Sequence, residues 1–298
     1  MNIIHFDVDA ELNKYLKGDT RSDSLLKIDA SENFSQIDAI SIKTGSNADE
    51  SALRSFSNLK LLITRTVGTD HIDMDYCKKK GIEVKNILDY GAFNIAEHVF
   101  ALLLSGTRNI IATQPEIQSG TFSFKGHLGM ALKGKMLGVI GTGRIGLEVI
   151  KLANAFGMKV VAFDVYKNEE ARKELGFEYV ELLDLAEISD VITLHAPLLD
   201  STKQMINKSI IKIMKDGVVL INTARGELVD TEALTQNIEK FRFVGLDVLE
   251  GEKTFSKDHP LLKFENVVIT PHIAFYSDAS VKKIAEETER ILNESIVQ

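Results

Sequence analysis

The stretch MLGVIGTGRIGLEVIKLANAFGMKVVAFD, residues Met136–Asp164, decides the fold class of this chain. It begins with an apolar run typical of a buried strand, continues with glycines spaced as GxGxxG, and then has the apolar periodicity of a helix. A second apolar run, Val160–Phe163, completes it. This order of elements predicts a βαβ unit of a parallel sheet, and the glycine spacing indicates a dinucleotide site.

Each glycine of this stretch has an expected purpose. Gly141 would allow the tight turn after the strand, Gly143 would let the backbone approach a diphosphate, and Gly146 would let the helix pack on the sheet. Asp164 ends the second strand, 18 residues after Gly146, where a carboxylate can bind the ribose hydroxyls of adenosine and repel a 2′-phosphate. The pattern therefore favours NAD over NADP, although a glycine turn without a nucleotide remains the alternative.

Outward from this unit, short apolar runs alternate with helical patterns along all 298 residues, a length that suggests two domains. The DHIDMD segment, residues 70–75, reads as a helix start rather than a metal site, because it lacks the glycine and distal glutamate of a calcium loop. A helix is also expected in the polar stretch between the first two strands, and an amphipathic one from Ser280 onward. Expected strands are Ile3–Phe6, Ala39–Ile42, Leu61–Thr64, Ile82–Val84, Leu137–Ile140, Val160–Phe163, Val191–Leu194, Val218–Asn222, Phe243–Asp247 and Val267–Thr270.

Composition excludes several classes of function. The net charge of −8, from 35 Lys and Arg against 43 Asp and Glu, argues against nucleic-acid binding. Cys77 is the only cysteine, so neither a disulfide framework nor a cysteine-based zinc site is expected. We find no signal peptide and no apolar run long enough for a membrane span. A cytoplasmic protein with no metal site is the resulting expectation.

Polar residues that suit carbonyl reduction stand where strands of the second half end. His195, Arg225, Asp247 and His272 each follow an apolar run, and ligands collect at the carboxyl ends of strands in open α/β sheets. An arginine can hold a substrate carboxylate, and a histidine can protonate the carbonyl oxygen. His272, which follows the strand-ending Pro271, could instead be a structural histidine. Its carboxylate partner could be Glu250 or Glu252 of LDVLEGE, residues 246–252.

The chain resembles the D-isomer-specific 2-hydroxyacid dehydrogenase family over nearly its whole length. The segments that carry the resemblance occur in the family's order: VGTDHID, the glycine fingerprint with Asp164, LAEISDVITLHAPLLDSTKQMIN, LINTARGELVD, GLDVLEGE and TPHIAFYS. The resemblance implies two Rossmann-like or flavodoxin-like domains with doubly wound parallel sheets, the cofactor domain being inserted into the substrate domain. Residues 1–96 and 275–298 would form the substrate domain, and residues 97–274 the NAD-binding domain.

The resemblance also implies roles for single residues. Arg225 would bind the substrate and His272 would be the acid/base; the family's glutamate lies five residues after the aspartate of the LDV strand, which selects Glu252 as its partner. The cofactor-binding residues would be Gly141, Gly143, Arg144, Ile145, Gly146, Asp164, His195, Pro197, Thr223, Ala224 and Asp247. The substrate would be contacted by Val67, Gly68, Tyr90, Arg225, Phe275 and Tyr276.

Within the family, Tyr90 and the AFYS segment after His272 are similar to the D-lactate dehydrogenase branch. The resemblance thus implies an NAD-dependent enzyme that reduces pyruvate to D-lactate, as a homodimer formed through the cofactor domain. Enzymes for 2-hydroxyisocaproate, glyoxylate, hydroxypyruvate or phosphoglycerate are alternatives. A corepressor-like module that senses NAD without catalysis is the alternative outside enzymes.

Overall fold

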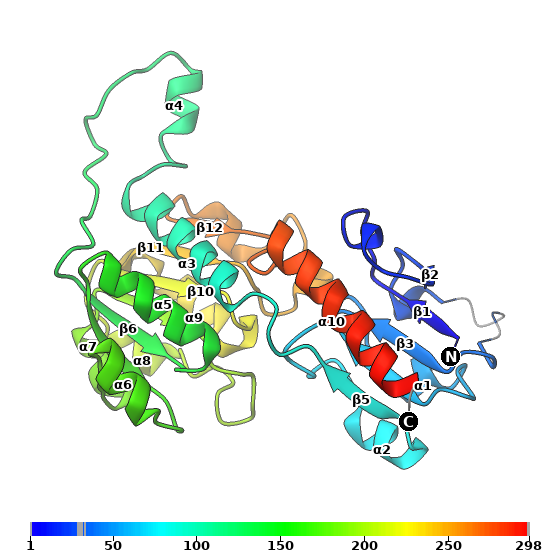
Figure 1. The fold of residues 1–298 in the computed structure, drawn as a ribbon. Helices are drawn as coiled ribbons and strands as arrows, with labels where there is room; N and C mark the ends of the chain where they lie inside the picture. The colour runs from blue at the N-terminus through cyan, green and yellow to red at the C-terminus, as the bar shows by residue number, and fades with distance from the viewer. Residues whose placement is uncertain (1, 29–31, 33, 297–298) are drawn as a thin grey trace. The chain divides into compact units, whose positions relative to one another are not determined.

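The computed structural model describes residues 2–28, 32 and 34–296, and the chain forms two compact units (Figure 1). Unit 1 comprises Met1–Gly91 and Tyr276–Gln298, and unit 2 comprises Ala92–Phe275. Each unit contains one parallel sheet with helices, which confirms the expected α/β class. The C-terminal segment returns to the unit formed by the first third of the chain.

The sheet of unit 1 has the strand order β2-β1-β3-β4-β5, which is the flavodoxin-like order. Strands β3 and β4 are buried along their whole length, as expected for the centre of a sheet covered on both faces. The strands are β1 (Ile3–His5), β2 (Asp19–Thr20), β3 (Ala39–Ile42), β4 (Leu61–Thr64) and β5 (Glu83–Asn86), and the helices are α1 (Glu50–Leu53), α2 (Met74–Lys80) and α10 (Asp278–Ile296).

Helix α2 shows why the DHIDMD segment starts a helix. The Asp73 side chain accepts a hydrogen bond from the Tyr76 N–H, and Gly81 ends the helix in the left-handed conformation with φ of 70°. Three lysines fill the last turn, where cations complement the helix dipole. In the described part of the chain, no cluster of three or more His, Cys, Asp or Glu side chains could hold a metal ion.

The polar stretch between β1 and β3 differs from the expectation of a helix. Its described residues form two short 3-10 turns, Leu12–Lys14 and Leu25–Lys27, and the two-residue strand β2. The stretch has no sustained apolar period of 3.6 residues, so it has no apolar face with which to hold an α-helix on the sheet. Each turn anchors one buried leucine, Leu12 or Leu25, instead.

The sheet of unit 2 has the order β12-β11-β10-β9-β6-β7-β8, and all its strands are parallel. Its strands are β6 (Met136–Ile140), β7 (Lys159–Phe163), β8 (Glu178–Tyr179), β9 (Val191–Leu194), β10 (Val218–Asn222), β11 (Phe241–Leu246) and β12 (Val267–Ile269). Its helices are α3 (Ala92–Thr107), α4 (Gln114–Gln118), α5 (Arg144–Ala155), α6 (Glu169–Leu175), α7 (Leu182–Ile188), α8 (Lys208–Ile213) and α9 (Thr231–Gln236), with 3-10 turns Gly226–Leu228, Ile238–Lys240, Glu252–Thr254 and Pro260–Lys263.

Two apolar cores cover the two faces of this sheet. Alternate residues of β10 point to opposite faces, so that Leu220 belongs to one core and Val219 and Ile221 to the other. Helices α3 and α5 bury their apolar residues in the second core, and α3 packs on β10 and β11. Helices α7, α8 and α9 supply the first core. The polar residues that follow the strands therefore lie at the edge of the sheet, outside these two apolar cores.

Helix α4 lies in a segment that extends away from the sheet of unit 2 (Figure 1). The sequence patterns did not predict this five-residue helix, and it contains no buried residue. We call residues 110–128 the arm. Large apolar side chains on the arm are open to solvent, with Phe122 at 96% and Phe124 at 88% relative exposure. Among the described residues, no helix is long and apolar enough to cross a membrane.

Candidate active site

The carboxyl ends of the parallel strands bring most of the expected residues to one edge of the unit 2 sheet. The glycine loop follows β6, Asp164 follows β7 and His195 follows β9. Arg225, Asp247 and His272 follow β10, β11 and β12, which are neighbours in the sheet. One half of this sheet edge, at β6 and β7, thus carries the glycine loop and Asp164. The other half, at β10 to β12, carries Arg225, Asp247 and His272.

The glycine loop has the geometry that a diphosphate needs. Gly141 has φ of 96°, a backbone conformation that favours glycine. A Cβ added at Gly146 would lie 2.1 Å from the Gly141 carbonyl oxygen, so helix α5 can approach the loop only with glycine there. A Cβ added at Gly143 would meet nothing within 4 Å. The open space beside Gly143 is next to Arg144 and Ile145, the first residues of α5, where N–H groups favour an anion.

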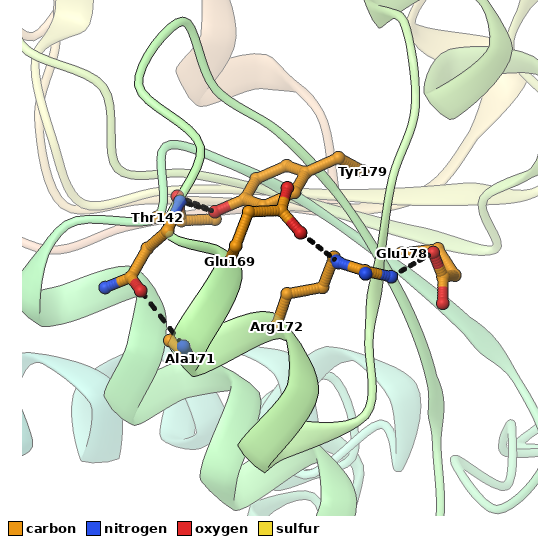
Figure 2. Close-up of polar contacts among 7 residues, drawn as sticks. Thr142, Glu169, Ala171, Arg172, Glu178 and Tyr179 are labelled. Atoms are coloured by element: carbon orange, nitrogen blue, oxygen red, sulfur yellow. Dashed lines mark hydrogen bonds and ion pairs between the residues drawn. The ribbon is translucent and has the colours of Figure 1, made fainter.

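Asp164 is held in place by groups that the sequence patterns did not identify. Its Oδ2 accepts hydrogen bonds from the Thr142 N–H at 2.6 Å and the Thr142 hydroxyl at 3.0 Å, and its Oδ1 accepts from the Tyr166 N–H. Figure 2 shows the Thr142 and Tyr179 hydroxyls facing each other, at 2.8 Å. These bonds fix the carboxylate at the end of β7, where a ribose would lie.

The segment after Asp164 is held by further hydrogen bonds and ion pairs, some of which Figure 2 shows. The Asn168 side chain caps α6 by accepting from the Ala171 N–H, and the Asn168 N–H donates to the Tyr179 hydroxyl. The Arg172 guanidinium lies between the Glu169 and Glu178 carboxylates, at 2.7 and 2.9 Å. The Thr142–Tyr179 hydroxyl pair joins residues 37 positions apart, so no local spacing in the sequence could reveal it.

The turn after β10 contains Thr223, Ala224 and Arg225. The buried Asn222 shapes the turn, because its amide donates to the Arg225 carbonyl and accepts from the Ala224 N–H. Thr223 is 8% exposed, and its hydroxyl has no hydrogen-bond partner among the described residues. A buried hydroxyl without a partner is costly, so this atom is suited to a bound ligand.

Arg225 lies close to the loop that carries Glu252. A Cβ added at Gly226 would be 1.9 Å from the Leu249 carbonyl carbon, so the two loops touch at their backbones. The Arg225 guanidinium donates to the Ala224 carbonyl at 2.8 Å through Nη1. Its charge is near enough to Glu252 to lower the pKa of that carboxyl.

The His272 imidazole is paired with Glu252. The Nδ1 atom lies 2.9 Å from Glu252 Oε1, while Glu250 is not in contact with the ring among the interactions of the described residues. Burial acts to raise the pKa of Glu252, but the hydrogen bond and charge of His272, the Leu249 N–H and Arg225 together hold it below its usual value. Glu252 is therefore an anion at neutral pH. Since Nδ1 is committed to Glu252, Nε2 is the atom available for proton transfer.

His195 is suited to lining a site but not to transferring protons. Burial lowers the pKa of its imidazole to about 3, so the ring is neutral at physiological pH. Its Nε2 lies 2.9 Å from the Thr193 hydroxyl, and its N–H donates to the Ile140 carbonyl. Pro197, two residues further along, is exposed. The His195 backbone also lies within 2.7 Å of a Cβ added at Gly141, which brings it beside the glycine loop.

The expected substrate residues divide between the two units. Phe275 belongs to unit 2, and Val67, Gly68, Tyr90 and Tyr276 belong to unit 1. The carbonyls of Val67 and Gly68 accept hydrogen bonds from Asn86 and Thr66, which orients this loop after β4. Tyr276 forms a hydrogen bond with Asp9 within unit 1, and desolvation together with the charge of Asp9 raises the pKa of its phenol.

Comparisons with known proteins agree with the fold. Residues 100–274 match the family described as D-isomer specific 2-hydroxyacid dehydrogenase, NAD binding domain. The chain is 40% identical over 277 residues to an aromatic 2-oxoacid reductase of Clostridium sporogenes, covering 86% of this chain and 82% of the relative. It is 38% identical over 276 residues to a hydroxypyruvate reductase of Thermotoga maritima, covering 91% and 88%.

Among solved structures, a D-lactate dehydrogenase from Aquifex aeolicus complexed with NAD and lactic acid is similar, with a TM-score of 0.89 and 39% identity over 99% of this chain and 95% of that one. The fold and site thus define an NAD-dependent oxidoreductase. The chain belongs to the D-isomer specific 2-hydroxyacid dehydrogenase family, whose members act on 2-hydroxy acids.

The residues present fit the cofactor of this family. The open space at Gly143, the fixed Asp164 carboxylate and the unpartnered Thr223 hydroxyl lie at the ends of β6, β7 and β10, three strands of one sheet edge. The diphosphate could approach the backbone at Gly143, and the ribose hydroxyls could donate to Asp164. The buried Thr223 hydroxyl could find its missing hydrogen-bond partner in the cofactor. NAD as the cofactor is in agreement with the matched NAD-binding family.

Proposed function

We propose that this protein reduces a small 2-keto acid, with pyruvate as the preferred substrate, to the D-2-hydroxy acid. The observation that carries the proposal is the His272–Glu252 pair at 2.9 Å, on the same sheet edge as Arg225 and the glycine loop. An imidazole paired with a carboxylate can give a proton to a carbonyl oxygen, and an arginine nearby can hold a carboxylate.

In this proposal each residue has one task. Arg225 binds the substrate carboxylate and polarises the keto oxygen, because a guanidinium donates two parallel hydrogen bonds to such groups. When NADH is bound, it supplies the hydride that reduces the keto carbon. His272, protonated and stabilised by the Glu252 anion, donates the Nε2 proton to the keto oxygen, which yields the hydroxyl.

Pyruvate is favoured by the likeness to the Aquifex aeolicus D-lactate dehydrogenase, which covers 99% of this chain. Larger substrates are the second candidate, because the relative that is 40% identical is an aromatic 2-oxoacid reductase. Phenylpyruvate therefore belongs beside pyruvate in any test.

NADH oxidation tests the proposal directly. The purified enzyme is assayed with pyruvate, phenylpyruvate, 2-ketoisocaproate, glyoxylate, hydroxypyruvate and phosphohydroxypyruvate, and kcat/KM should be highest for pyruvate. His272→Gln should lower kcat by roughly 10² to 10⁴, the range of general acid/base catalysis. His259→Gln, at the residue that precedes and caps the 3-10 turn Pro260–Lys263, serves as the matched control. Tight NADH binding without turnover on any of these acids would instead support an NAD-sensing module.

We also propose that two copies associate through unit 2 by means of the arm. Several large apolar side chains of the arm are exposed, and its helix has no buried residue. Exposed apolar surface of this kind is typical of an interaction site. We propose that the arm, which belongs to unit 2, binds a second copy of the same chain. We also propose a cytoplasmic location, with which a chain that has one cysteine and hence no internal disulfide is compatible.

A further inference from the structure

A chain of hydrogen bonds connects helix α3 to the segment that carries His272. His98, in the second turn of α3, has its Nε2 atom 3.1 Å from the Thr270 hydroxyl. The Thr270 hydroxyl lies 2.5 Å from Asp247 Oδ1, and His98 Nε2 itself is 3.5 Å from the same oxygen. His98 and Thr270 are 172 positions apart in the sequence, and no expected role was attached to either.

The direction of these bonds follows from the number of protons. A carboxylate can only accept, so the Thr270 hydroxyl gives its single proton to Asp247. The Thr270 oxygen can then only accept from the ring of His98. His98 must therefore carry a hydrogen on Nε2, and the chain runs from His98 through Thr270 to Asp247.

Asp247 in turn holds the backbone of the catalytic segment. Its main-chain carbonyl accepts from the His272 N–H at 2.9 Å, its Oδ1 accepts from the Ile273 N–H at 2.9 Å and its Oδ2 accepts from the Ala274 N–H at 2.8 Å. One residue thus binds three successive N–H groups. The Asp247 side chain is fully buried, so water does not compete for these bonds.

His272 needs this support because its backbone is in an uncommon conformation. Its φ is 55°, in the left-handed region that residues other than glycine seldom adopt. This conformation turns the chain immediately after β12 and directs the imidazole to Glu252. If the Asp247 carboxylate rotates, the N–H groups of residues 273 and 274 lose their acceptor. The turn that carries the His272 imidazole is then no longer held in place.

We propose that His98 is a positioning residue for His272: by donating to Thr270, it fixes the Asp247 carboxylate that holds the turn at residues 272–274. A carboxylate has about four acceptor positions, and Thr270, Ile273 and Ala274 occupy three of them. This role deepens the proposed reaction and rests on it for its effect on turnover. The hydrogen-bond chain itself lies wholly within unit 2.

Two pairs of variants test the proposal. His98→Leu and Thr270→Val remove the donor and the relaying hydroxyl, and each should lower kcat about tenfold, because small misplacements of a catalytic group are costly. His98→Gln, whose amide can donate near the position of Nε2, should recover kcat to within about threefold of the parent. Ser105→Ala, which removes a hydroxyl that bonds only within α3, is the matched control.

The double variant His98→Leu/Thr270→Val separates a shared chain from two independent effects. If both residues act through Asp247, the double variant should be no slower than the slower single variant. A kcat that falls by the product of the two single losses would overturn the proposal. So would His98→Leu with the kcat of the parent, or His98→Gln as slow as His98→Leu, since bulk alone would then explain the loss.

A measurement without turnover keeps this inference distinct from the proposed reaction. Nitrogen-15 spectra of the imidazole of His272 report the hydrogen bond to Glu252 in the substrate-free protein. We expect the His272 signals to shift in His98→Leu and Thr270→Val, but not in Ser105→Ala. Unchanged signals in all three variants would overturn the positioning role. If the parent enzyme reduces none of the keto acids while these signals shift, the proposed reaction fails and the positioning role stands.

Discussion

His272 Nδ1 lies 2.9 Å from Glu252 Oε1, and the two residues come from loops that follow neighbouring strands, β12 and β11. Glu252 is charged at neutral pH, because its contacts with His272, the Leu249 N–H and Arg225 outweigh burial and keep its pKa below the usual value. The pair therefore places a negative charge directly beside the imidazole that we propose as the proton donor.

Glu252→Gln should change the pH dependence of reduction. A neutral amide no longer places a negative charge beside the proton-donating ring. The alkaline limb of the kcat profile for keto-acid reduction should therefore move to lower pH. Glu250→Gln is the matched control, two residues earlier in the same loop, and should leave the profile in place. The reverse pattern would assign the partner role to Glu250.

Arg225→Lys should damage substrate binding selectively. An ammonium group cannot form the two parallel bonds of a guanidinium with a carboxylate. The KM for the keto acid should rise about tenfold or more, since a hydrogen bond to a charged group contributes roughly 1.5 to 3 kcal/mol. The Kd of NADH should stay within about twofold, and Arg290→Lys on helix α10 should change neither constant. Equal losses for acid and cofactor would contradict this role.

Gly143→Ala and Gly146→Ala should fail in different ways. The Cβ at position 143 enters open space, so this variant should keep the Tm of the parent but bind NADH more weakly, by about tenfold or more, if the diphosphate approaches there. The Cβ at position 146 would meet the Gly141 carbonyl oxygen at 2.1 Å, so that variant should lose stability. Thermal melting and NADH fluorescence titration measure the two effects. Normal NADH affinity in Gly143→Ala would remove that glycine from the cofactor site.

The sequence was informative where function depends on local spacing. The glycines after β6, the aspartate after β7 and the polar residues after β10 to β12 lie in short motifs, and the pattern of strands predicted the α/β class that the structure confirms. What it could not show are contacts between distant segments. The Thr142–Tyr179 pair and the His98–Thr270–Asp247 chain join different elements, and single threonines carry no pattern of their own.

The sequence patterns also failed to predict the shortest elements of the structure. The arm contains a helix of only five residues, Gln114–Gln118, without an apolar period to predict it. The stretch after β1 was expected to contain a helix, but its described residues form 3-10 turns that each bury one leucine. Local bonds set such conformations, for example the Asp9 carboxylate that accepts from the Glu11 and Leu12 N–H groups.

The arm should determine the oligomeric state. Replacing Phe122 and Phe124 together by serine removes two large apolar groups that are almost fully exposed in a single chain. We expect sedimentation to give twice the mass of one chain for the parent and the mass of one chain for the variant. Leu183→Ser, on the exposed face of helix α7, is the control and should remain a dimer. A monomeric parent would contradict association through the arm.

His5 should make the stability of the protein depend on pH below neutrality. Its ring is fully buried, bonded to the Ser41 hydroxyl and the Lys17 carbonyl, and burial, together with the charge of Arg65, lowers its pKa from 6.5 to about 4. Between these two pH values the unfolded state binds a proton that the folded state does not, so stability is lost as pH falls from 6.5 to 4, by roughly 3 kcal/mol in total. In urea unfolding, the advantage of the parent over His5→Gln should be constant above pH 6.5 and shrink by about that amount at pH 4. A difference that stays the same across this range would mean that His5 titrates equally in both states.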